Sequence, residues 1–261
     1  MTTTIHIGWG YLFIIHLDMG VLGAAIALNL TYISGYVAQE FYINVIAHEF
    51  FKDFLQPIFT KKSFDGPGAK EFLRLGVPGT MMQCAEWWAF ELLAIFAGMM
   101  GKHQLAAQVA VINIIGFIFM VPLGVQFSAS ALVGGCVGSK NVPLAKKHAI
   151  THIIYCELLM TIIMVLIKFN EDAVAGLFTD HPEDIAYIKE VLSLMSIYLI
   201  LDGIHGVNTG IVRAVGKQFR ASVATLCCYY IFGMPLALIL GFKADMGLVG
   251  FWLGFTVALS F

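Results

Sequence analysis

Long apolar runs, separated by short polar stretches, dominate the pattern of hydrophobic and polar positions along the chain. About 20 consecutive apolar residues cross the hydrocarbon core of a bilayer as a helix, so the length of these runs, rather than any periodicity within them, indicates helices. The runs predict spans at 5–17, 20–46, 76–100, 104–135, 149–169, 185–212, 220–242 and 246–261, of which the first and last are short. We therefore expect an all-α, polytopic membrane helix bundle with about eight spans.

Composition supports a membrane protein and excludes most soluble classes. Of the 261 residues, 59% are hydrophobic and only 12% are charged, against about 25% charged in soluble domains. The five cysteines all lie in apolar runs, without metal-ligand or disulfide spacing. We expect a multi-pass integral membrane protein of the plasma membrane or of a vacuolar or other organelle membrane, with no metal and no cofactor.

Positive charge is concentrated in every second loop. Eleven of the 15 Lys and Arg residues lie in three loops, at 47–75, around Lys140 to Lys147, and around Arg213 to Arg220. The loops between them are acidic or nearly neutral. Since basic loops stay on the cytoplasmic side of a membrane, this alternation predicts that the three basic loops are cytoplasmic and supports the number of spans.

The longest connection, 47–75, is expected to link two helix bundles. Phe50, Phe51, Phe54 and Leu55 repeat at helical spacing, which predicts an amphipathic helix at the cytoplasmic interface. The Gly66-Pro67-Gly68 sequence then favours a break before the next span.

A short repeat indicates an internal duplication. The sequence Asp-Met-Gly-Val-Leu-Gly at 18–23 recurs as Asp-Met-Gly-Leu-Val-Gly at 245–250, each time between two apolar runs. Transporters are commonly built from duplicated bundles. We therefore divide the chain into a partial N-terminal lobe at 1–46 that holds its last two helices, a linker at 47–75, and a six-helix C-terminal lobe at 76–261. By this interpretation the chain lacks about four helices at its N-terminus.

Two carboxylates lie within the apolar stretch from Met81 to Ala97. An ionised acid in hydrocarbon costs several kcal/mol, so an intramembrane acid is a functional-site candidate. Five residues at about 100° each separate Glu86 and Glu91 by roughly 140° around a helix. We therefore assign Glu86 to a cavity and Glu91 to a supporting role, with a simple helix contact as the alternative for Glu91. Asp202, midway along another apolar run, is a further buried acid, and Glu157 ranks below both.

Proline interrupts two of the predicted spans, at Pro122 and at Pro235. Such breaks often line a binding cavity, and we expect structural hinges there. A bend that serves only helix packing is the alternative, because proline is common in membrane helices.

Several motifs together resemble one transporter family. The sequence Glu-Trp-Trp-Ala-Phe-Glu at 86–91 is similar to the seventh-helix signature of the eukaryotic-type multidrug and toxic compound extrusion (MATE) transporters. The segments that surround Pro122, that run from Asp202 to Gln218, and that run from Tyr229 to Gly254 resemble helices eight, ten, and eleven to twelve of that family. The resemblance covers nearly the whole chain and depends on the order of these motifs.

The resemblance implies two six-helix lobes around a central cavity, and efflux of organic cations, drugs or secondary metabolites in exchange for protons, less often sodium. Glu86 and Asp202 match the acidic residues of the family's C-terminal lobe. Asn113 stands where some relatives have a glutamate, so one proton or cation group is replaced by a neutral amide. With Trp87, which lies beside Glu86 and can stack on a cation, and with Tyr229 and Glu91, these residues form the candidate site for protons and substrate.

The leading hypothesis is thus a proton-coupled antiporter, not an enzyme. Its expected partners are a small organic cation and the lipid bilayer, without nucleic acid, and we expect a monomer. Two alternatives stay open. One is a non-transporting fragment of such a transporter. The other is an integral-membrane enzyme acting on lipid or isoprenoid, which is disfavoured because the buried acids are scattered over separate helices and the basic loops lack an Asp-rich motif.

Overall fold

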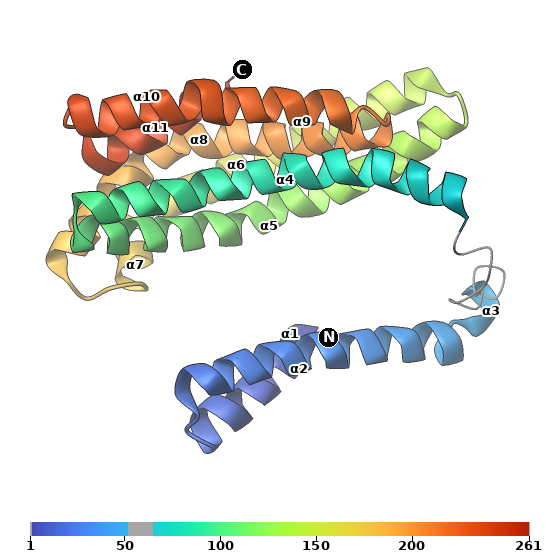
Figure 1. The fold of residues 1–261 in the computed structure, drawn as a ribbon, viewed down its shortest axis with the longest axis horizontal. Coiled ribbons are helices and arrows are strands. Elements are labelled where there is room, and N and C mark those ends of the chain that lie inside the picture. Colours follow the sequence, from blue (N-terminus) through green and yellow to red (C-terminus); the bar gives the residue numbers. More distant parts are fainter. Residues whose placement is uncertain (1, 52–64, 261) are drawn as a thin grey trace. The chain divides into compact units, whose positions relative to one another are not determined.

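The protein is described by a computed structural model that covers residues 2–51 and 65–260. Within these ranges all regular structure is helical, which confirms the all-α prediction (Figure 1). The chain forms two compact units, Met1–Gly66 and Pro67–Phe261, and the boundary between them falls inside the stretch expected to be a linker. Phe54 and Leu55, half of the expected interfacial helix, lie outside the described residues.

The N-terminal unit is a helical hairpin. Its elements are α1 (Thr2–Gly10), the π-helix η1 (Tyr11–His16), α2 (Gly20–Phe41), the π-helix η2 (Tyr42–Ile46) and the short α3 (His48–Phe51). The buried residues of α2 are small and four apart: Gly23, Ala27, Thr31 and Gly35. This spacing forms one helix face on which α1 packs closely. His6 Nδ1 lies 2.9 Å from Thr31 Oγ1 across that contact.

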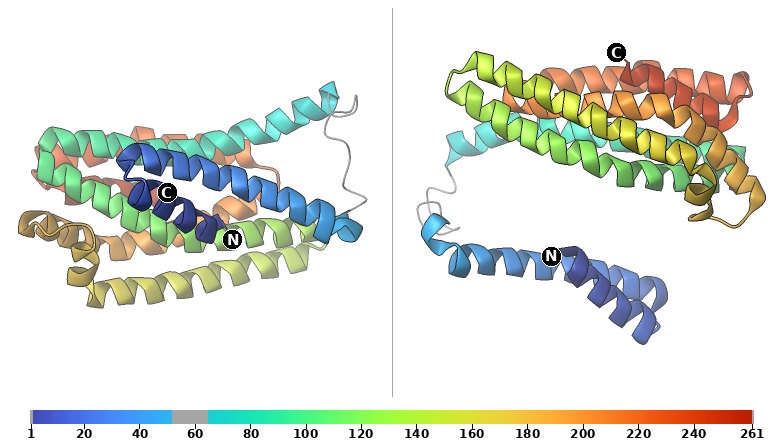
Figure 2. Two further views of the ribbon diagram at one scale, coloured as in Figure 1. Left: turned by 90° about the horizontal axis from the view of Figure 1, so that it is seen from below. Right: turned by 180° about the vertical axis from the view of Figure 1, so that it is seen from behind.

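The C-terminal unit is a bundle of long helices that lie side by side along a common axis (Figures 1 and 2). It consists of α4 (Gly66–Met100), α5 (Lys102–Gly138), α6 (Val142–Phe169), the short α7 (Glu171–Gly176), α8 (Pro182–Ala214), then α9 (Gln218–Leu226), η4 (Cys227–Gly233), α10 (Met234–Leu238) and η5 (Ile239–Lys243), and finally α11 (Gly247–Leu259). The segments from α9 to η5 form one continuous helical rod, Gln218–Lys243.

Several described helices are suited to cross a membrane. By length and composition these are Gly20–Ile46, Lys102–Gly138, Val142–Phe169 and Gln218–Lys243, while Gly247–Leu259 is a shorter apolar helix. α4 and α8 are comparably long, at 35 and 33 residues, but carry more polar and charged residues, among them Glu86 and Asp202. α4 also begins earlier than expected, because Pro67 occupies its first turn, where a missing N–H costs nothing.

The repeated Asp-Met-Gly sequence adopts the same backbone conformation in both copies. The φ angles are 49° and 55° at Asp18 and Asp245, and 53° and 56° at Gly20 and Gly247. A π-helical turn precedes each copy, and the amides of Met19 and Met246 donate to carbonyls six residues earlier, at 3.1 and 3.2 Å. Glycine adopts positive φ without steric cost, which explains its place in the turn. This local identity supports the proposed duplication of the bundle.

The two expected hinges differ in structure. α5 runs through Pro122 without a break, and Pro122 is buried against α8, where a Cβ atom added to Gly206 would meet the Pro122 Cβ at 3.1 Å. Pro235 is exposed and lies directly after the change from the π-helical η4 to the α-helical α10 at Gly233. The interruption expected at Pro122 is therefore a tight helix contact, whereas the one near Pro235 is a real irregularity of the backbone.

A buried acid pair in the C-terminal unit

α4 carries Glu86 into the interior of the C-terminal unit. Glu86 is 7% exposed, and Phe90, one helical turn later, is also buried. Glu91 lies on an exposed face of the same helix, as a five-residue separation dictates. The structure thus places the two acids of the Glu-Trp-Trp-Ala-Phe-Glu motif in different environments, with Glu86 inside.

α8 supplies the second acid. Asp202 is 1% exposed, and the Tyr198 hydroxyl, one turn earlier, donates to Asp202 Oδ1 at 3.5 Å. Among the described residues, Asp202 Oδ2 has no hydrogen-bond partner. Since a buried polar atom without a partner costs free energy, this oxygen is available to a proton, a water molecule or a bound cation.

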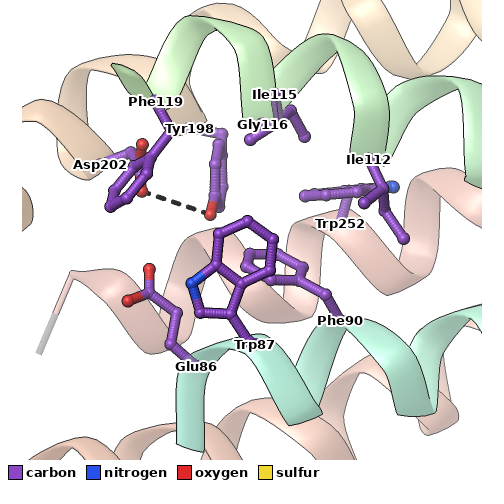
Figure 3. A pocket seen from close by; sticks show the side chains of 10 residues that line it. All are labelled: Glu86, Trp87, Phe90, Ile112, Ile115, Gly116, Phe119, Tyr198, Asp202 and Trp252. Carbon is purple, nitrogen blue, oxygen red and sulfur yellow. Dashed lines mark hydrogen bonds between the residues drawn. The ribbon is translucent and has the colours of Figure 1, made fainter. Parts of the chain in front are cut away.

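Both acids line one pocket, with about 350 Å³ of empty space (Figure 3). Figure 3 shows the two carboxylates at the same end of the pocket, Glu86 from α4 and Asp202 from α8. The remaining walls are apolar or aromatic and come from four helices: Trp87, Phe90, Ile112, Ile115, Gly116, Phe119, Tyr198 and Trp252.

The aromatic wall is held by packing among its own rings. Phe90 stacks on Trp252 with ring centroids 5.7 Å apart, and Tyr198 meets Trp252 edge-on at 5.3 Å. Trp252 Nε1 in turn donates to Gln108 Oε1 at 2.9 Å, with both side chains fully buried. Ring faces carry negative charge density, so such a wall beside two carboxylates is suited to a cation.

Two further polar groups lie beside the Glu86 carboxylate. The Tyr229 hydroxyl, from η4, donates to Glu86 Oε1 at 3.5 Å. His205 Nε2, from α8, lies 3.8 Å from Glu86 Oε2. Sequence reasoning included Tyr229 but missed His205, although a spacing of three residues from Asp202 on a helix could have indicated it.

The other predicted site residues are placed as follows. Trp87 lies in the pocket wall and is 39% exposed. Asn113 lies on an exposed face of α5, where its amide donates to the Val109 carbonyl at 2.8 Å, and it does not line the pocket. Within the described residues, no group of three or more His, Cys, Asp or Glu side chains is placed to hold a metal ion.

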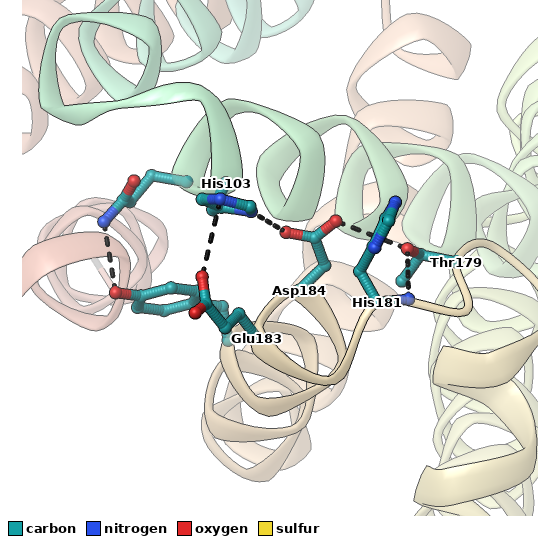
Figure 4. Close-up of polar contacts among 7 residues, drawn as sticks. His103, Thr179, His181, Glu183 and Asp184 are labelled. Carbon is teal, nitrogen blue, oxygen red and sulfur yellow. Dashed lines mark hydrogen bonds and ion pairs between the residues drawn. The ribbon is translucent and has the colours of Figure 1, made fainter.

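A second polar cluster joins the beginnings of α5 and α8, at the end of the bundle away from the basic loops (Figure 4). His103 Nδ1 lies 2.8 Å from Asp184 Oδ1, and the Thr179 hydroxyl donates to Asp184 Oδ2 at 3.3 Å. Glu183, which is largely exposed, lies 3.4 Å from His103 Nε2. This cluster fixes the ends of the two helices that carry much of the pocket wall.

A family profile described as MatE matches residues 78–239, more than half of the chain. The chain belongs to the MatE family. It is 31% identical over 251 residues to multidrug and toxin extrusion protein 1 of Danio rerio, covering 94% of this chain and 41% of that protein. It is also 31% identical over 246 residues to the Xenopus tropicalis protein of the same name, covering 94% and 42% respectively.

Solved MATE structures share the fold. The eukaryotic MATE transporter AtDTX14 superposes with a TM-score of 0.86 at 24% identity, covering 99% of this chain and 57% of the other. The Vibrio cholerae MATE transporter VcmN superposes with a TM-score of 0.82 at 18% identity, again over 99% of this chain and 57% of the other.

Membership of the MatE family confirms the resemblance drawn from the motifs and the expectation of a multi-pass integral membrane protein. It also sets aside the membrane-enzyme alternative, because the matched relatives are extrusion transporters by name. The chain spans about two fifths of the length of these relatives, 41% and 42%.

Proposed function

We propose that this MatE chain belongs to a secondary active transporter that exports organic cations, drugs or other xenobiotics in exchange for protons. The observation that carries the proposal is the pocket shared by Glu86 and Asp202, with aromatic walls and an unpartnered carboxylate oxygen. The names of the relatives, which describe multidrug and toxin extrusion, agree with it.

The chemistry follows from the burial of two acids side by side. Two carboxylates that share a pocket of low dielectric repel each other and lack hydration, so the site favours a bound positive charge. A proton and an organic cation both supply that charge, and therefore they compete. Proton entry from the outer side would release the cation outward, and proton loss toward the cytoplasm would restore the cation site.

The remaining candidate residues take supporting roles in this proposal. Trp87 offers a ring face to the cation, and Tyr229 orients Glu86 through its hydroxyl. Asn113, exposed on α5, and Glu91, exposed on α4, stand outside the pocket. We propose that neither takes part in exchange within this unit, and that the protein acts as a monomer.

Efflux from vesicles under an imposed pH gradient tests the proposal. Glu86→Gln keeps size and hydrogen bonding but cannot carry charge, and should abolish pH-driven efflux at unchanged expression. Asp202→Asn should do the same. Glu91→Gln is the matched control, because Glu91 belongs to the same motif but is exposed, and it should retain most of the activity. Normal exchange in Glu86→Gln would show that Glu86 is only a packing carboxylate.

A second candidate is suggested by the coverage of the relatives. Because the chain spans about two fifths of their length, it could act as the part of such a transporter that binds the cation without moving it. Equilibrium binding, measured beside efflux, distinguishes the two. Binding that is lost in Glu86→Gln, without any pH-driven efflux in the parent protein, would favour this candidate.

A further inference from the structure

A second cavity lies on the other side of Glu86 from the aromatic pocket. It holds about 780 Å³ of empty space, including its opening, and is more polar than the first. Its walls come from α4, α8, the rod from α9 to η4, and α11: Met82, His205, Asn208, Thr209, Val212, Ala221, Ala224, Thr225, Cys228, Tyr229, Ala258 and Leu259.

The position of this cavity along the bundle follows from its lining. Val212 and Ala221 flank the basic connection between α8 and α9, which holds Arg213, Lys217 and Arg220. The aromatic pocket is instead lined by residues from the first halves of α5 and α11. The charge pattern assigns the basic connection to the cytoplasmic side. The second cavity therefore occupies the inner half of the unit, and the aromatic pocket the outer half.

His205 lies between the two spaces. Its ring lines the inner cavity, and its Nε2 atom is 3.8 Å from Glu86 Oε2, whose carboxylate lines the outer pocket. The His205 side chain is 24% exposed, while that of Glu86 is 9% exposed. His205 is thus the more accessible partner, and it faces the side from which protons would have to leave.

The groups around His205 are suited to stabilise a transient imidazolium. Glu86 from α4 and Asp202 from its own helix are the acids near the ring. The Tyr229 hydroxyl and the Cys228 thiol, from η4, line the same cavity. Arg213, the cation nearest the inner end of α8, donates to Gln83 Oε1 at 3.2 Å and is engaged there.

We propose that His205 is the relay through which Glu86 exchanges protons with the inner cavity. This inference rests on the proposed antiport function and specifies its inward proton path. Protonated Glu86 gives its proton to Nε2 of neutral His205, which leaves a carboxylate and an imidazolium. The imidazolium then releases its Nδ1 proton to water in the inner cavity, and the neutral ring resets by rotation. Because 3.8 Å exceeds a direct hydrogen bond, the first transfer takes place after a small side-chain shift or through one water molecule.

The relay separates two transport modes that a structural role would affect together. Net efflux needs a proton to cross from Glu86 to the inner side on every cycle, whereas exchange of labelled for unlabelled cation at equal pH needs no net proton movement. In reconstituted vesicles, with tetraethylammonium as the probe, His205→Gln should lower pH-driven efflux at least tenfold and leave cation exchange within about twofold. His152→Gln, a change to a histidine on α6 outside both cavities, should alter neither mode.

Two results would overturn the relay: wild-type pH-driven efflux in His205→Gln, or an equal loss of both modes. A second measurement decides the matter even if the parent protein shows no pH-driven efflux, in which case the proposed function fails by itself. After an acid jump on the inner side, the fluorescence that is lost in a Trp87→Phe variant reports protonation of the neighbouring Glu86. That signal should develop at least tenfold more slowly in His205→Gln, and an unchanged rate would exclude the relay.

Discussion

The indole N–H of Trp252 donates to the side-chain oxygen of Gln108 at 2.9 Å, and neither side chain is exposed. This bond joins α11 to α5 behind the aromatic pocket. Gln108→Leu would leave the indole N–H unpartnered in the interior, which should destabilise the protein by about 1–3 kcal/mol. Thermal unfolding in detergent, followed by intrinsic fluorescence, measures the loss.

The matched control for that prediction removes both polar groups. In the double variant Gln108→Leu, Trp252→Phe no donor is left without an acceptor, so the loss should be smaller than the sum of the two single losses. Additive losses would show that the bond contributes little and that packing alone fixes α11.

The closest approach of α5 and α8 depends on Gly210. A Cβ atom at this position would lie 2.3 Å from the backbone oxygen of Gln126, a distance that requires the helices to move apart. Gly210→Ala should therefore destabilise the unit by about 1–3 kcal/mol, the usual cost of overpacking. Gly124→Ala is the control on α5, because a Cβ atom there would meet nothing within 4 Å, and it should be neutral or stabilising by up to about 1 kcal/mol. Equal melting temperatures for the two variants would contradict the tight contact.

The adjacent tryptophans of the α4 motif should differ in their effect on cation affinity. Trp87 lines the pocket beside Glu86, whereas Trp88 is 64% exposed and outside it. A cation–π contact contributes about 0.5–2 kcal/mol, so Trp87→Ala should weaken binding of an organic cation roughly 2- to 30-fold. Trp88→Ala should leave the dissociation constant unchanged. Equilibrium binding to purified protein measures both, and equal effects would place the cation elsewhere.

The polar cluster at the start of α5 and α8 should depend on Asp184 and not on Glu183. The Asp184 side chain is 7% exposed and contacts both His103 and Thr179, whereas the Glu183 side chain is 74% exposed. Asp184→Ala leaves two partners unsatisfied and should cost about 1–3 kcal/mol of stability. Glu183→Gln removes only a surface pair and should stay within about 0.5 kcal/mol. Comparable melting temperatures for the two variants would show that the cluster carries no structural weight.

The sequence by itself determined the class of the protein, the course of its helices and the identity of its family. Length and apolarity of a run are local properties, and they predict a membrane helix because the bilayer core offers the backbone no other hydrogen-bond partner. The order of motifs from Glu86 to Gly254 led to the MatE family for the same reason, since it needs no knowledge of which helices touch. The separation of Glu86 from Glu91 also followed from helix geometry alone.

Only the tertiary structure decided which side chains meet. Glu86 and Asp202 lie on helices far apart in the sequence, and their common pocket depends on how α4 and α8 pack around Trp252 and Phe90. For the same reason Asn113, a polar residue in an apolar span, lies on an exposed face, whereas His205 faces Glu86. Pro122 shows the limit most clearly: its sequence favours a break, but packing against Gly206 keeps α5 continuous. Side-chain contacts between distant helices depend on rotation and close approach, and neither is encoded in any local pattern.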